Sequence, residues 1–157
     1  HLEEIPRSDS SEKAEGLEVV IPLGDPKNLG ALIRTCVAFG VQKIHLTTES
    51  AHPYLPHSLK ASAGAVLNAP LYRGGNLLDW DLASSWALDP SGPSLEKIPK
   101  PTSARIIVGE EGPGLKGFEK AQKVSIPIRD VESLNATVAA SLLLWQWRFL
   151  PEKKSKN

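Results

Sequence analysis

The sequence predicts an α/β domain with a mostly parallel sheet and helices on both faces. Two observations support this fold class. Short apolar runs alternate with helical segments along most of the chain, which is typical of strands joined by crossover helices. Glycine, proline and aspartate stand at many of the junctions, and these residues mark turns. The 157 residues are enough for one domain with a buried core.

The first half of the chain is expected to hold three strands and two helices. The strands are apolar runs at 17–23, 43–48 and 65–73, and the helices are 28–40 and 55–64. Asn28 is the expected N-cap of the first helix, because its side-chain oxygen can accept a hydrogen bond from a free first-turn N–H group. Gly40 and Gly64 are expected to end the two helices.

The second half is expected to add three strands and a long helix. A strand at 84–88 precedes a Pro-rich loop, and a strand at 104–110 runs into a glycine-rich loop at 109–117. The remaining elements are a brief helix at 118–122, a strand at 123–128 and a helix at 133–149. Polar residues stand in front of the strongly apolar last helix, either as its cap or as part of a ligand site.

Three regions are expected along the chain. Residues 1–16 are polar without a period and form a linker or N-terminal arm, residues 17–150 form the folded domain, and residues 151–157 form a basic disordered tail. The chain begins His-Leu and contains no Met. We therefore expect the start not to be a natural initiation site, and the chain to be either a compact protein or the catalytic part of a longer one.

Composition indicates a soluble globular protein, with 41% hydrophobic and 23% charged residues. No run approaches the roughly 18 apolar residues of a transmembrane helix, and the polar start does not resemble a signal peptide. The single cysteine, Cys36, excludes an internal disulfide framework and fits a reducing cytoplasm. Four scattered histidines show no metal-ligand spacing, so no metal is expected.

The charge of the chain does not identify the kind of molecule that the protein binds. The net charge is zero, which argues mildly against nucleic-acid binding, because phosphate affinity comes from Lys and Arg. The charges are unevenly distributed, with a net of −5 over residues 1–96 and +5 over residues 97–157. The basic part could form a surface patch, although solvated helix faces are the commoner explanation.

Three segments are candidates for chemistry. Arg34 follows small residues on its helix face, so it either reaches toward a ligand or pairs with a surface acid, and the two explanations carry equal weight. The glycines of "GEEGPGL" after a strand allow close backbone approach, although the segment is neither GxGxxG nor a Walker P-loop. The third segment is "ESLN" before the last helix.

Together these segments resemble the SpoU (TrmH-like) RNA 2′-O-ribose methyltransferases of the SPOUT superfamily, over about residues 17 to 149. The resemblance rests on three motifs in the family's order, which are Asn28-x-Gly30-x-x-x-Arg34 with Ala38-Phe39-Gly40, Gly109-x-Glu111-Gly112-x-Gly114-Leu115, and Ile126-Pro127-Ile128 with Glu132-Ser133-Leu134-Asn135. It implies a C-terminal deep trefoil knot, an exception to the rule that chains are unknotted. It also implies a homodimer that acts on tRNA or rRNA.

The resemblance further implies bound S-adenosylmethionine and a set of site residues. The cofactor-binding positions are Val108, Gly109, Ile126, Ile128, Leu134 and Asn135. The catalytic positions are Arg34, Asn28, Glu111, Ser133 and Asn135. Two other classes stay open: a catalytically silent RNA-binding paralogue that retains the knotted fold, and a small-molecule nucleotide-binding enzyme.

Overall fold

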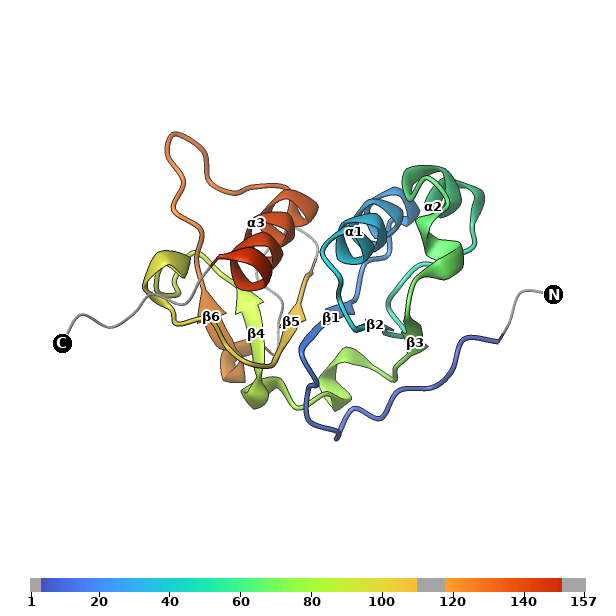
Figure 1. Cartoon of the computed structure of the whole chain (residues 1–157), viewed down its shortest axis with the longest axis horizontal. Helices are drawn as coiled ribbons and strands as arrows, with labels where there is room; N and C mark the ends of the chain where they lie inside the picture. The colour runs from blue at the N-terminus through green and yellow to red at the C-terminus, as the bar shows by residue number, and fades with distance from the viewer. Residues whose placement is uncertain (1–3, 110–117, 151–157) are drawn as a thin grey trace.

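A six-stranded parallel sheet forms the centre of the molecule (Figure 1). The computed structural model describes residues 4–109 and 118–150. In this part of the chain the strand order is β3-β2-β1-β5-β4-β6, and every pairing between neighbouring strands is parallel. The strands are β1 (Leu17–Ile21), β2 (Lys43–Leu46), β3 (Leu71–Arg73), β4 (Ser85–Leu88), β5 (Ala104–Ile107) and β6 (Gln122–Val124). The predicted α/β fold class is confirmed.

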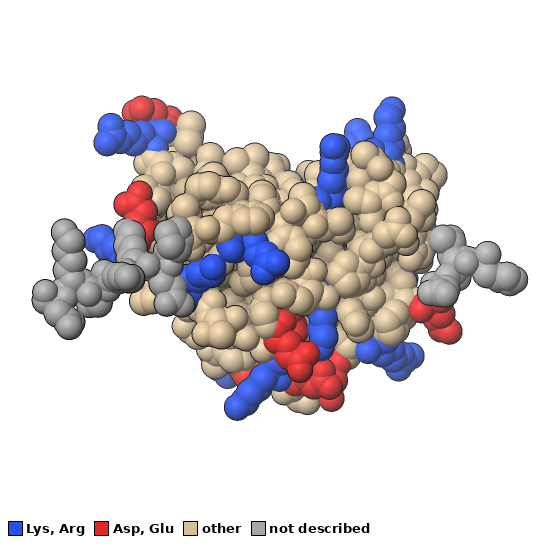
Figure 2. Space-filling view, viewed as in Figure 1, with Lys and Arg blue, Asp and Glu red and all other residues tan. Residues whose placement is uncertain are grey.

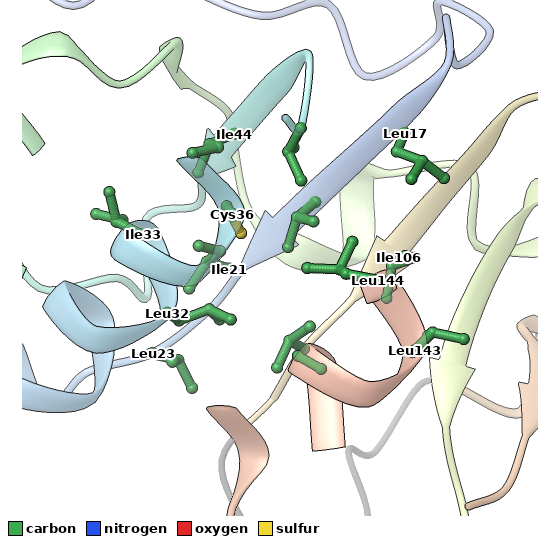
Figure 3. Close-up of a cluster of buried hydrophobic side chains, with 14 of the residues drawn as sticks. Leu17, Ile21, Leu23, Leu32, Ile33, Cys36, Ile44, Ile106, Leu143 and Leu144 are labelled. Atoms are coloured by element: carbon green, nitrogen blue, oxygen red, sulfur yellow. The ribbon is translucent and has the colours of Figure 1, made fainter. Parts of the chain in front are cut away.

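Among the described residues, three α-helices pack on one face of the sheet: α1 (Pro26–Ala38), α2 (Pro56–Ala61) and α3 (Ala136–Phe149). Helix α1 lies between the other two (Figure 1). Figure 3 shows apolar side chains of α1 and α3 meeting those of β1 and β5, with Cys36 and Leu144 beside Ile21 and Ile106. These side chains are buried, so the helices are held on the sheet by the main apolar core.

Short 3₁₀ helices cover part of the opposite face. Two of them are η2 (Leu77–Asp79) and η3 (Leu82–Ser84), and their leucines join Trp80, Val20 and Ile107 in a second buried cluster. The others are η1 (Ala65–Asn68), η4 (Leu95–Lys97) and η5 (Phe118–Lys120). Helical segments therefore lie on both faces, as predicted. Every described helix is too short or too polar to cross a bilayer.

Helix α1 begins earlier than predicted. Asp25, not Asn28, is the N-cap: its carboxylate accepts a hydrogen bond from the Asn28 N–H at 2.8 Å, and Pro26 takes the first helical position, where a missing N–H costs nothing. The C-terminal stop is confirmed. Gly40 has a φ of 67°, and the Val41 N–H donates to the Cys36 carbonyl at 3.0 Å, as in a Schellman motif.

The predicted strands are longer than the observed ones, most of all those at 65–73 and 123–128. Residues 65–68 form η1 instead of a strand, and only Leu71–Arg73 pairs with β2, because Pro70 lacks the N–H that a strand interior needs. Strand β6 ends at Val124, so Ile126 and Ile128 lie in the loop that follows. These corrections leave the order of the elements unchanged.

The N-terminal arm packs along the edge of the sheet. The Arg73 N–H donates to the Pro6 carbonyl at 2.7 Å and the Ser8 N–H donates to the Arg73 carbonyl at 2.9 Å, so the arm lies beside β3 (Figure 1). Ile5 is buried in the main core. The predicted trefoil knot depends on residues 110–117, which lie outside the described residues, and it stays a prediction.

Candidate functional site

The candidate site lies at the carboxyl edge of the sheet. Because the strands are parallel, the segments that follow β1, β5 and β6 all start at this edge. Strands β1 and β5 are neighbours, yet the chain continues from β1 to β2 on one side and from β5 to β6 on the other. Such a switch point is where ligands bind in open α/β sheets. The edge therefore brings residues from distant parts of the sequence together.

The end of β5 contributes predicted cofactor-binding positions. Val108 is buried, and its N–H donates to the Val20 carbonyl at 3.1 Å, which ties this segment to β1. Gly109 follows at the edge and is half-buried. Glu111, a predicted catalytic residue, lies outside the described residues.

The loop after β6 offers backbone groups for binding. Ser125 is anchored, since its N–H donates to the Pro93 carbonyl at 2.9 Å and its carbonyl accepts from the Leu95 N–H at 2.8 Å. In contrast, residues 126–134 form no hydrogen bond with any other residue that the structure describes. Three apolar side chains of this stretch are half-buried: Ile126, Ile128 and Leu134. The loop thus combines apolar side chains with N–H and C=O groups that have no partner among the described residues and are open to water or a ligand.

The start of α3 joins the same loop. Asn135 Oδ1 accepts hydrogen bonds from the N–H groups of Thr137 at 3.0 Å and Val138 at 3.3 Å. The cap interpretation is therefore confirmed for Asn135, while its side-chain NH₂ stays available as a donor. Ser133 lies outside the helix and is exposed. The helix begins at Ala136, three residues later than predicted.

The predicted pair on α1 does not share one face. Asn28 lies in the first turn, at the carboxyl edge, whereas six residues separate it from Arg34, or about 120° around the helix. Phe39 is on the Asn28 side and contacts Phe149 of α3, with ring centroids 6.1 Å apart. Gly30 is on the Arg34 side and faces α2. The structure therefore brings Asn28 to the side of α3 and places Arg34 on the side of α2.

Arg34 has no acidic partner among the described residues. Its side chain is exposed and takes part in no ion pair there. The alternative of a surface arginine paired with an acid is thus unsupported in this part of the chain.

Sequence reasoning missed a buried polar network on the opposite face. Glu18 Oε2 accepts from Arg105 Nη2 and lies beside His45 Nε2, each at 3.0 Å, and the Arg105 guanidinium lies 5.0 Å from the Trp80 ring centroid. Burial alone would raise the pKa of Glu18, but hydrogen bonds from His45, the Glu15 N–H and Arg105, together with the charge of Arg105, lower it to about 2. The sequence signal that could have revealed this network is a charged residue inside an apolar strand, as at Glu18 in β1 and Arg105 in β5.

A metal centre finds no support in the described residues. No group of three or more His, Cys, Asp and Glu side chains lies together there as ligands would. The buried titratable residues that lie together in the described chain belong to the Glu18 network, where Arg105 and His45 already satisfy the carboxylate.

Comparison with known proteins identifies relatives over most of the chain. The model described as the SpoU rRNA Methylase family matches residues 18–145. A protein of Syntrophobacter fumaroxidans named ribosomal RNA small subunit methyltransferase G 2 is 40% identical over 134 residues, which cover 84% of this chain. That alignment spans only 27% of the relative's length.

Similar solved structures include three methyltransferases. A putative RNA methyltransferase of the TrmH family from Porphyromonas gingivalis gives a TM-score of 0.76 at 30% identity, covering 87% of this chain and 60% of that one. An AdoMet-bound rRNA methyltransferase from Sinorhizobium meliloti gives 0.73 at 25% identity, covering 88% and 59%. A structure described as an RNA 2′-O ribose methyltransferase gives 0.72 at 29% identity, covering 96% and 61%. The chain thus corresponds to about three fifths of each.

Proposed function

Because the chain belongs to the SpoU rRNA methylase family, we propose that it transfers a methyl group from S-adenosylmethionine to a ribose 2′-hydroxyl of tRNA or rRNA. The observation that carries the proposal is the meeting of the family's segments at one sheet edge. Gly109, the 126–134 loop and Asn135 all lie where parallel strands end. This arrangement supports the proposal, because ligands of open α/β sheets bind at the carboxyl ends of the strands.

The residues of this edge fit S-adenosylmethionine. Its adenine needs an apolar surface and hydrogen-bond partners along one ring edge, and backbone groups supply such partners without side-chain charge. Ile126, Ile128 and Leu134 provide half-buried apolar surface, and the backbone between them is unpaired within the described chain. We propose these residues, with Val108, Gly109 and Asn135, as the cofactor site.

The bound cofactor supplies a methyl group made electrophilic by its sulfonium. The protein then has to align the ribose hydroxyl with that methyl group and to handle one proton. Arg34 is a poor general base, because a guanidinium keeps its proton at any ordinary pH. It suits instead a role in holding an RNA phosphate and stabilising developing alkoxide charge. In this proposal Glu111 orients Arg34 or the ribose, Asn28, which lies on the other flank of α1, orients the ribose, and Ser133 and Asn135 line the pocket.

The 2′-hydroxyl is the finer part of the proposal. It is supported by the likeness to the structure described as an RNA 2′-O ribose methyltransferase, at 29% identity. The name of the Syntrophobacter relative supports a ribosomal substrate but states no acceptor atom. The alternative is a silent RNA-binding paralogue, which the presence of Arg34 and Asn135 disfavours. Metal-free chemistry and a cytoplasmic location stay predictions.

We also propose a homodimer built on α3. Trp145 and Trp147 lie on different sides of this helix, since Trp147 is 1% exposed and Trp145 46% exposed. Val138, Leu142, Trp145 and Phe149 are all exposed and recur at spacings of four, three and four residues, so they form one apolar stripe. An exposed stripe of this kind is typical of a protein interface.

Arg34→Ala tests the proposed function. We expect the variant to lose methyl transfer, because the transition state loses its cation, while its affinity for S-adenosylmethionine stays nearly unchanged. Transfer is followed with radiolabelled cofactor and bulk RNA, and alkaline hydrolysis identifies the acceptor, since a 2′-O-methyl group protects the adjacent phosphodiester. Calorimetry measures cofactor binding.

Lys13→Ala is the matched control, because it removes an exposed cation on the N-terminal arm. Full transfer by Arg34→Ala would show that the assigned role of Arg34 is wrong. A wild-type chain that binds the cofactor and RNA but transfers nothing would favour the silent paralogue. Clear NAD or ATP binding without S-adenosylmethionine binding would favour the nucleotide-binding enzyme.

A further inference from the structure

Four basic side chains extend from the end of the molecule formed by α1 and α2. They are Lys27 and Arg34 on α1 and His57 and Lys60 on α2, and we call this surface the α1–α2 ridge. All four are exposed, and none takes part in an ion pair with a described residue. Figure 2 shows Lys and Arg side chains projecting from this end without an Asp or Glu among them on this face.

Close packing of the two helices holds these side chains together. Lys27 and Arg34 are seven residues apart, so they lie on one flank of α1. The same flank carries Gly30, where an added Cβ would collide with the carbonyl oxygen of Ser58 and lie 3.0 Å from Ala61 Cβ. Glycine thus lets α2 approach the basic flank of α1, with His57 and Lys60 in the turn of α2 that makes this contact.

The ridge belongs to a segment that is nearly free of acids. Residues 26–78 contain five Lys and Arg residues but one acidic residue, Glu49. Asp25, which precedes them, accepts a hydrogen bond at the start of α1. Elsewhere on the surface both signs of charge occur together, as where Lys43 of β2 pairs with Glu12 and Glu15 of the N-terminal arm. A surface that carries only positive charge, without acidic partners, favours binding of a polyanion.

We infer that the α1–α2 ridge binds the phosphate backbone of RNA beside the proposed site. Helices α1 and α2 both begin at the carboxyl edge of the sheet, because each follows a parallel strand. A strand of RNA held by Lys27 and Lys60 would therefore run along the edge where the 126–134 loop lies. The assignment of RNA as the polyanion rests on the proposed function, whereas the binding surface itself rests on the charge and packing described above.

A charge-removal pair tests the ridge. We expect Lys27→Ala/Lys60→Ala to weaken binding of a fluorescein-labelled RNA hairpin about tenfold or more at low salt. The slope of log K against log salt should fall in magnitude by about 1.5, because two phosphate contacts are lost. Fluorescence anisotropy over a salt series measures both quantities. The matched control is Lys13→Ala/Lys120→Ala, which removes two exposed cations from the amino-edge side.

The outcomes separate the ridge from the proposed chemistry. Three results would each refute RNA binding by the ridge. They are an unchanged salt slope in the ridge variant, an equal loss of RNA affinity in the control variant, and no RNA binding by the wild type. Circular dichroism and calorimetry with S-adenosylmethionine, measured on the same variants, show that fold and cofactor site are retained. A wild-type chain that binds the hairpin through the ridge but transfers no methyl group supports the ridge and refutes only the proposed activity.

Discussion

Glu18 shows how one residue in a strand constrains a whole face of the sheet. It is the second residue of β1 and has no exposed side-chain surface, and it lies between His45 of β2 and Arg105 of β5. Arg105 also donates to the Glu12 carbonyl at 2.8 Å, so the same network fixes the N-terminal arm. Breaking a buried pair by removing one partner leaves the other charge unsatisfied. We therefore expect stability to depend on this carboxylate being ionised.

Acid should remove that contribution. The folded pKa of Glu18 is about 2 against an ordinary value of 4.5, so the stabilisation is present above about pH 4.5 and is lost as pH falls toward 2. The shift corresponds to about 3 kcal/mol. Urea denaturation at several pH values should show Glu18→Gln to be less stable than wild type at pH 7, with the difference shrinking toward pH 2.

Glu15→Gln is the control for this effect, because Glu15 is a largely exposed acid of the arm. If the stability difference between wild type and Glu18→Gln stayed constant from pH 7 to 2, the network would not be held by the ionised carboxylate.

Asn135 combines two roles at one position. Its side-chain oxygen caps α3 through Thr137 and Val138, and its place after the 126–134 loop brings it to the carboxyl edge. A capping residue contributes about 1 kcal/mol to a helix. Capping alone therefore explains why Asn stands at position 135. Its proposed role in the cofactor site is supported instead by its position next to the 126–134 loop.

At the scale of elements, the contact between α1 and α2 depends on Gly30. Alanine normally stabilises a helix interior by about 1 kcal/mol relative to glycine. Here the added methyl group meets Ser58 and Ala61, so the two helices would have to separate. We expect Gly30→Ala to destabilise the fold by about 1–3 kcal/mol, the usual cost of overpacking, measured as a lower Tm.

The sign of the change in Tm tests this prediction. A higher Tm for Gly30→Ala would mean that helix propensity outweighs the contact and that α2 can move away at little cost. Ala38→Gly, on the exposed side of the same helix, calibrates the propensity effect alone.

At the scale of the whole molecule, the apolar stripe of α3 is either buried against a partner or left exposed to water at a cost in free energy. Trp147 packs in the core against Trp86, with ring centroids 5.3 Å apart, whereas Trp145 and Phe149 are exposed on the same helix. A helix that is apolar on both sides is typical of one buried by the domain on one side and by a partner on the other. The homodimer proposal follows from the exposed apolar side of α3, which the described residues of the domain do not cover.

Trp145→Asp should convert a dimer into a monomer without unfolding it. Sedimentation at micromolar concentration measures the association state, and circular dichroism reports the fold. Leu78→Asp, a change at an exposed leucine of η2 that is 67% exposed, should leave the dimer intact. A wild-type chain that sediments as a monomer at this concentration would refute the dimer.

Several features of the fold and site were predictable because they depend on neighbours in sequence. The end of α1 at Gly40 and a polar cap in front of α3 are local features, and both were found, although α3 begins three residues later than predicted. The N-cap of α1 was assigned wrongly, because Asp25, Pro26 and Asn28 all suit a helix start and only the backbone path selects Asp25. The strand predicted over 65–73 was also wrong, since an apolar run of that length does not distinguish a 3₁₀ turn from a strand.

The sequence by itself determined the alternation of strands and helices, the family motifs and the positions of the turns, because periodicity and turn chemistry are properties of neighbouring residues. Only the tertiary structure decided which of these segments meet. Strand order brings the ends of β1 and β5 side by side, packing at Gly30 sets the basic side chains of two helices on one ridge, and the burial of Glu18 depends on β2 and β5 lying on either side of it. Such contacts join residues far apart in the chain, and their energies exist only once the sheet has formed.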